Sequence, residues 1–123
     1  MATTAFADVL ASAREPGTSR FSAANIANAL GLPFQDLAAL AGVHRNTLRT
    51  HPESPRLQVA LRDLMRVLSA AAAVQPDAER AFFMVKNEPI AAFRHKTLLQ
   101  LVQEGRTDDV IDYLESISAG FAG

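Results

Sequence analysis

The stretch that decides the fold runs from Phe34 to Arg49 and reads FQDLAALAGVHRNTLR. A helix-turn-helix needs a small residue on its first helix, a Gly at the turn and an aliphatic residue that anchors its second helix. Ala38, Gly42 and Leu48 meet these needs in that order. The spacing therefore predicts two short helices joined by a tight turn, with the second as a candidate recognition helix for DNA.

Polar side chains lie on or near the start of this second helix. Arg and Asn can make paired hydrogen bonds to guanine and adenine edges. Between His44 and Arg66 the chain carries five Arg against two acidic residues, so Arg62 is a further candidate for a phosphate contact. The alternative is an ordinary helical hairpin with a solvated basic face. The DNA-contacting residues that we predict are His44, Arg45, Asn46, Thr47, Arg49 and Arg56.

Outside this stretch, apolar residues recur at helical spacing and no segment shows the alternation of a half-buried strand. A long amphipathic helix is predicted from Ser54-Pro55, where Ser can cap and Pro suits the first helical position. Ser22 and Thr97 can cap other helices, and the last predicted helix ends near Ile117. The predicted fold class is all-α.

Pro- and Gly-containing stops divide the chain into three predicted regions. Residues 1–20 form an N-terminal helix or arm, residues 21–75 a helix-turn-helix DNA-binding region, and residues 76–123 a second helical region.

Composition argues against several functional classes. The chain of 123 residues is 49% hydrophobic and 20% charged, which suits one folded domain, and it contains no Cys. Its three His residues have no partner at ligand spacing, so we expect no metal site. We find no nucleophile motif and no Gly-rich phosphate loop, and we therefore expect no catalytic residue and no enzymatic activity.

The location that we expect is the cytoplasm. The opening residues lack the basic and apolar regions of a secretory signal. No apolar stretch approaches the roughly 20 residues that a membrane-spanning helix needs. We therefore expect no membrane association.

Charge reverses toward the C-terminus, where residues 104–123 carry five acidic residues against one Arg. Asp108 and Asp109 fall in the first turn of the last predicted helix, where the helix dipole favours negative charge. This contrast with the basic stretch suggests that the two parts bind different partners.

With its second half included, the chain resembles the Xre/MbcA/ParS antitoxin family. The matching stretch is NEPIAAFRHKTLLQLVQEGRTDDVIDYLESISAG, with its Asn-Pro loop, its Thr97 helix start and the Gly105 stop, and the resemblance spans about residues 21–120. Two departures are visible. Phe82-Phe83-Met84 stands where many relatives carry Trp, and Leu98 stands where Pro often follows the Thr.

The resemblance implies an Xre-like helix-turn-helix followed by a small helical toxin-binding domain, which makes residues 76–123 the predicted toxin-binding region. It implies a partner toxin of the RES-domain type, which uses NAD by degrading it or by ADP-ribosylating a protein, so that the antitoxin itself needs no cofactor. It also implies homodimerisation and repression of the operon's own promoter through operator DNA. The runner-up interpretations are a free-standing dimeric transcription regulator and a helical adaptor without DNA binding.

On this view the acidic last helix docks on the toxin, and the Gly-containing tail over residues 118–123 enters the NAD pocket. A flexible, slender tail with one aromatic ring could occupy a nucleotide site. The alternative is a frayed terminus. The toxin-binding residues that we predict are Asp109, Asp112, Tyr113, Ser116, Ser118, Gly120, Phe121 and Gly123.

Overall fold

The structure is a computed structural model that describes residues 5–122, with side chains described for residues 5–120. No strand occurs among these residues, and the predicted all-α class is confirmed. The helices are α1 (Phe6–Ser12), α2 (Ala23–Leu30), α3 (Phe34–Ala41), α4 (Thr47–Thr50), α5 (Pro55–Ala72), α6 (Ala78–Asn87), the 3-10 helix η1 (Ala91–Phe93), α7 (Leu98–Gln103) and α8 (Thr107–Ala122).

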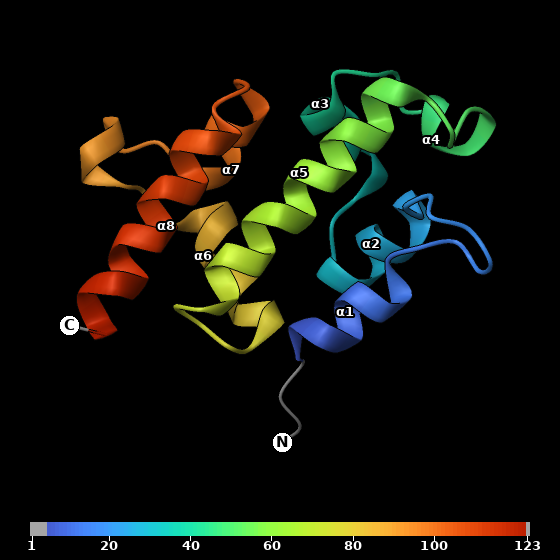
Figure 1. The fold of residues 1–123 in the computed structure, drawn as a ribbon. Coiled ribbons are helices and arrows are strands. Elements are labelled where there is room, and N and C mark those ends of the chain that lie inside the picture. Colours follow the sequence, from blue (N-terminus) through green and yellow to red (C-terminus); the bar gives the residue numbers. More distant parts are fainter. Residues whose placement is uncertain (1–4, 123) are drawn as a thin grey trace.

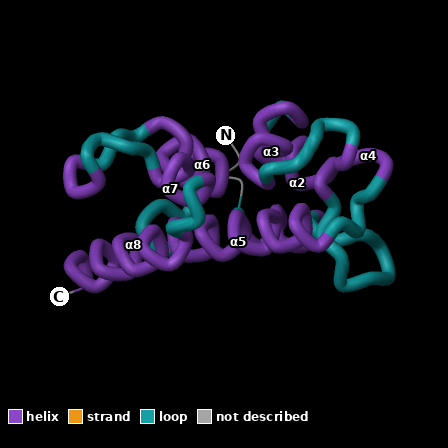
Figure 2. The backbone as a smooth tube through the Cα atoms, turned by 90° about the horizontal axis from the view of Figure 1, so that it is seen from above, coloured by secondary structure: helices purple, strands orange, loops and turns teal. Residues whose placement is uncertain are grey.

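The long helix α5 is the centre of the molecule (Figure 1). It packs against α1 and α3 on the side of the N-terminal half, and against α6 and α8 on the side of the C-terminal half. Seen from above, α5 and α8 lie along one side, while α3, α6 and α7 lie along the other (Figure 2). The helix α5 therefore joins the predicted DNA-binding and toxin-binding regions through one shared core.

Apolar spacing explains why α5 is central. Leu57, Leu61 and Leu64 are fully buried, and they recur at the three- and four-residue intervals that keep side chains on one helix face. Burying a leucine side chain contributes about 1.5–3 kcal/mol relative to leaving it exposed. The buried stripe continues through Met65 and Leu68 toward α6 and α8.

Local signals fix several helix ends. The predicted caps at Ser22 and Thr97 are confirmed: the Ser22 side chain accepts a hydrogen bond from the Asn25 backbone N–H, and the Thr97 side chain accepts one from the Gln100 backbone N–H. The Gln100 side chain also accepts from the Thr97 backbone N–H, which completes a capping box that was not predicted from the sequence. Ser54 precedes α5 without a side-chain capping bond, which corrects its predicted role. Pro55 still occupies the first turn of α5, where a missing backbone N–H costs nothing.

The predicted end of the last helix is wrong. The helix α8 continues to Ala122, so residues 118–122 are helical rather than a slender tail, and Gly123, the last residue of the predicted tail, lies outside the described residues. The physical reason is that one Gly near a helix end weakens a helix by only about 1 kcal/mol. The helical path that Val110 and Leu114 anchor in the core can therefore continue past Gly120.

Candidate functional site

The turn between α3 and α4 is built as its sequence predicts. Gly42 adopts a left-handed conformation with φ of 67°, and its N–H donates to the Ala38 and Ala39 carbonyls at the end of α3. Val43 N–H donates to the Ala38 carbonyl at 3.0 Å, which completes a Schellman-type helix end. Ala38 is buried, and Leu48 on α4 is 5% exposed, so both ends of the turn are anchored in the core.

The segment after the turn is a short helical path rather than a long helix. The helix α4 has four residues, but backbone hydrogen bonds of the i+3 type already begin at the His44, Arg45 and Asn46 carbonyls. The Nδ1 atom of His44 accepts a hydrogen bond from the Asn46 N–H at 3.1 Å. This side-chain contact holds the start of the path, and the helical bonding ends with His51 N–H on the Thr47 carbonyl.

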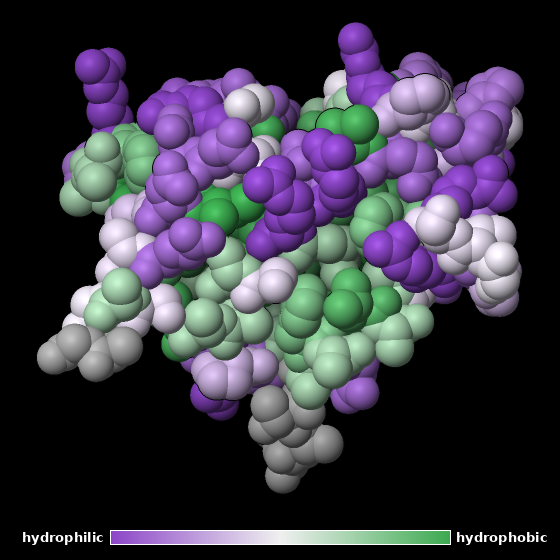
Figure 3. Space-filling view, in the orientation of Figure 1, coloured by the Kyte–Doolittle hydropathy of each residue, from purple (hydrophilic) through white to green (hydrophobic). Residues whose placement is uncertain are grey.

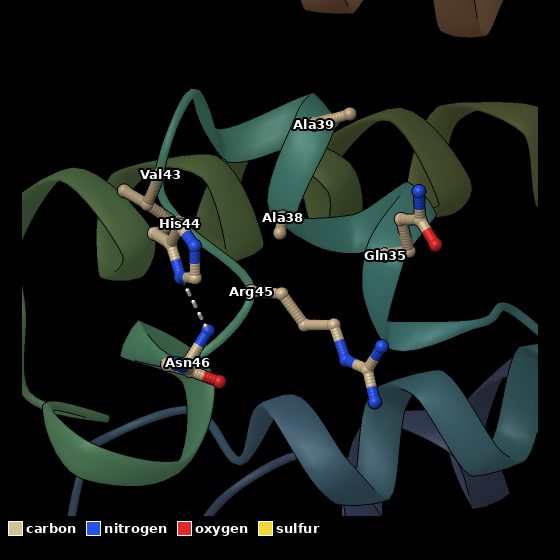
Figure 4. Close-up of a pocket in the computed structure, with 7 residues that line it drawn as sticks. All are labelled: Gln35, Ala38, Ala39, Val43, His44, Arg45 and Asn46. Carbon is tan, nitrogen blue, oxygen red and sulfur yellow. Dashed lines mark hydrogen bonds between the residues drawn. The ribbon is translucent and has the colours of Figure 1, made fainter.

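A shallow hollow of about 500 Å³ separates α3 from this path. In Figure 4, Arg45 and Gln35 lie on one side of the hollow, His44 and Asn46 lie on the other, and Ala38 lies between them. Gln35 is exposed at the start of α3 and was missed by the sequence prediction. Its position three residues before Ala38, on the first turn of a short helix, could have indicated it.

The predicted DNA-contacting residues gather at this end of the molecule. His44, Arg45, Asn46 and Arg49 are exposed and Thr47 is half-buried. Neither Arg45 nor Arg49 has an ion pair or side-chain hydrogen bond among the described residues, so their guanidinium groups are available to a ligand.

Arg56 and Arg62 are differently placed. The Nη1 atom of Arg56 donates to the Gly42 carbonyl at 3.2 Å, which ties the start of α5 to the turn. Arg62 lies farther along α5 and pairs with Asp63 at 3.3 Å. Arg56 thus belongs to the surface around the turn, whereas the charge of Arg62 is already partly balanced.

One carboxylate lies beside this basic surface. Glu53 is exposed in the loop between α4 and α5, and its carboxylate is 3.4 Å from Nδ1 of His51. A hydrogen bond from its own backbone, followed by the contact with His51, holds the pKa of the Glu53 carboxyl below its usual range. Glu53 is therefore charged at neutral pH and reduces the net positive charge of the neighbouring surface that carries Arg49 and Arg56.

The helix α8 carries the acidic surface. Four of the predicted toxin-binding residues are exposed and share one face of this helix, because they recur at intervals of three and four residues. They are Asp109, Asp112, Ser116 and Gly120. Asp109 accepts from Nε of Arg106 at 2.9 Å. Asp112 has no ion pair or hydrogen bond among the described residues and keeps its full charge for a partner.

Other predicted toxin-binding residues lie elsewhere. Tyr113 is half-buried, and its ring meets the Phe93 ring edge-on with centroids 5.6 Å apart. Ser118 is half-buried on the opposite side of α8 from the exposed face, which separates it from the other members. Phe121 lies in the last turn of the helix, and Gly123 lies outside the described residues.

An apolar surface, which we call the α1–α5 surface, lies between α1 and the middle of α5. Phe6, Leu10, Phe21 and Met65 line a hollow of about 250 Å³ there, and Leu10 is 42% exposed. Figure 3 shows hydrophobic residues gathered at the lower centre of the front face, where Figure 1 places α1. Arg14, Arg62 and Arg66 border the same hollow.

Comparison with known proteins adds no assignment: no protein-family model matches the chain, and neither does any curated protein or solved structure. Within the described residues, no group of three or more His, Cys, Asp and Glu side chains is arranged to hold a metal ion. Across residues 5–122, no helix combines the length and the apolar character needed to cross a membrane.

Proposed function

We propose that this chain is an antitoxin that neutralises a RES-domain, NAD-using toxin by blocking its active site, and that it represses its own operon by binding operator DNA. The observation that carries the proposal is the separation of two charged surfaces. Arg45 and Arg49 are exposed, have no ion pair among the described residues, and lie just before α4 and within it, while the acidic face belongs to α8. Figure 2 shows α4 and α8 at opposite ends of the molecule.

DNA binding is supported by the geometry of α3, the Gly42 turn and α4, which we interpret as a helix-turn-helix. The exposed Arg45 and Asn46 stand at the start of the second helix, the position from which side chains reach base edges in the major groove. Arg56 would contact a phosphate next to the turn. Anchoring by the buried Leu48 keeps these side chains in one orientation on the surface.

Toxin binding is supported by the face of α8. Asp112 offers an uncompensated charge, and Asp109, Ser116 and Gly120 extend the same exposed face toward the end of the helix. Because residues 118–122 are helical, we revise the blocking element from a flexible tail to the last turn of α8. The helix end would cover the NAD pocket sterically, and NAD would be bound by the toxin alone, without a cofactor or catalytic residue in this chain.

Homodimerisation is supported by the α1–α5 surface. Phe6, Leu10, Phe21 and Met65 come together at one hollow, and a contiguous apolar surface of this kind is a site that a second copy would cover. Two copies would also present two α4 helices to an operator with matching half-sites.

Co-expression tests the proposal against a free-standing dimeric regulator, which would use the same DNA-binding surface. An antitoxin should restore growth to cells that express a RES-domain toxin encoded beside it. A regulator would bind its promoter fragment equally well but would leave growth arrested, and this result would overturn the antitoxin proposal.

A further inference from the structure

The loop between α6 and α7 is a closed and well-fixed turn. Ile90 is buried, and its carbonyl accepts hydrogen bonds from both Phe93 N–H and His95 N–H at 2.9 Å. Ile90 N–H in turn donates to the Lys96 carbonyl at 2.9 Å, which forms an isolated antiparallel bridge. The side chains at the tip of the loop are therefore presented from a fixed backbone.

Two consecutive residues at the tip have left-handed backbone conformations. Arg94 has φ of 57° and His95 has φ of 64°, and they are the only residues other than glycine with positive φ among residues 5–122. Side chains rarely adopt this conformation, and glycine would adopt it more easily. Strain of this kind is retained where the side chain has a use.

A hollow of about 320 Å³ lies beside the strained tip, and we call it the Arg94 hollow. It is lined by Ala92, Phe93, Arg94, Lys96 and Arg106. Three of these five residues are cationic, and no carboxylate lines the hollow.

The three cations differ in how far they are neutralised. Nζ of Lys96 is held by both carboxylate oxygens of Glu104 at 2.7 and 2.9 Å. Arg106 pairs with Asp109 through Nε and lies over the Phe93 ring at 5.3 Å, so its terminal nitrogens have no partner within the described residues. Arg94 has no ion pair or side-chain hydrogen bond in the same part of the chain. One full positive charge is therefore uncompensated.

We propose that the Arg94 hollow binds a phosphate group, either on a free small molecule or in a nucleic-acid backbone. The planar guanidinium groups of Arg94 and Arg106 match the oxygen geometry of phosphate, and Lys96 adds a point charge. The two neighbouring carboxylates hold Lys96 and Arg106 in place, while Arg94 supplies the excess charge. This site lies outside the α3–α4 surface and does not depend on the function proposed above.

The test is calorimetric titration of the full chain with sodium pyrophosphate, followed by titration with a random-sequence DNA duplex. The variant Arg94→Gly removes the guanidinium and relieves the backbone strain, so its melting temperature should be equal to or above that of the wild type. Arg80→Ala, at an exposed arginine on α6 that pairs with Asp77 at 3.6 Å, is the control for loss of one cation outside the hollow.

We expect Arg94→Gly to weaken binding by about tenfold or more, since hydrogen bonds to charged groups are worth at least that factor. Arg80→Ala should leave binding unchanged. If Arg94→Gly binds pyrophosphate more weakly than the wild type, the ligand is a free phosphate compound. If only the binding of the DNA duplex is weaker, the ligand is the nucleic-acid backbone. Equal binding by wild type and Arg94→Gly in both arms would overturn the proposal, whether or not the chain proves to be an antitoxin.

Discussion

Replacing a glycine with alanine should lower the free energy of unfolding at Gly42 and raise it slightly at Gly120. At Gly42, φ is +67°, and a Cβ built there meets no heavy atom within 4 Å. The cost of Gly42→Ala is therefore conformational rather than steric. A left-handed alanine costs about 1–2 kcal/mol, and the lower entropy of the unfolded alanine chain returns part of this cost, so the net loss should be about 1 kcal/mol.

Gly120 is the matched control. It lies in the last turns of α8, its φ is not positive, and a Cβ there also meets nothing within 4 Å. Alanine is favoured over glycine in helices by about 0.5–1 kcal/mol, and the lower end applies near a helix end. Gly120→Ala should therefore stabilise the chain slightly, by up to about 0.5 kcal/mol.

Urea unfolding followed by circular dichroism measures both effects. The urea concentration at the midpoint of unfolding should fall for Gly42→Ala and stay the same or rise for Gly120→Ala. The slope of the unfolding free energy against urea concentration should be unchanged in both variants. A Gly42→Ala variant as stable as the wild type would refute the argument, because the turn would then not require a left-handed residue. A strongly destabilised Gly120→Ala would contradict the helical path of residues 118–122.

The remaining predictions concern the two charged surfaces and the buried residue that anchors α4. In gel-shift titrations, Arg45→Ala and Arg49→Ala should each cost about 1–3 kcal/mol of discrimination between operator and random DNA. A variant that binds the operator as tightly as the wild type would exclude the contact. Arg56→Ala should weaken binding to all DNA sequences alike, and the affinity should then depend less steeply on salt concentration. Leu48→Ala should destabilise the fold by about 2–5 kcal/mol, measured by thermal unfolding, and a smaller loss would mean that α4 is not anchored there. A chain truncated after Ile117 should still bind the toxin but should no longer inhibit it, and full inhibition would refute blocking by the end of α8.

Sequence patterns were sufficient for the fold class and for the local turn geometry. The apolar stripe of α5, the Ser22 cap and the left-handed Gly42 each follow from short-range chemistry that the sequence displays directly. Such features depend on residues close together in the chain, and periodicity detects them.

Features that depend on contacts between distant segments were harder to predict. The sequence predicts too early an end for α8 because the glycine at position 120 suggests a stop, whereas the core contacts of Leu114 that support the helix come from other segments. Tyr113 is among the predicted toxin-binding residues, and helical spacing alone cannot show that Phe93, in another segment, packs against it. The Arg94 hollow was missed for the same reason, since Arg106 reaches it from the next helix connection.

The most direct test of the central claim is the rate at which a RES-domain toxin encoded beside this chain consumes NAD, measured with and without an equimolar amount of the chain. We predict that NAD consumption falls to background when the full chain is present and recovers with the chain truncated after Ile117. An unchanged rate of NAD consumption in the presence of the full chain would contradict it.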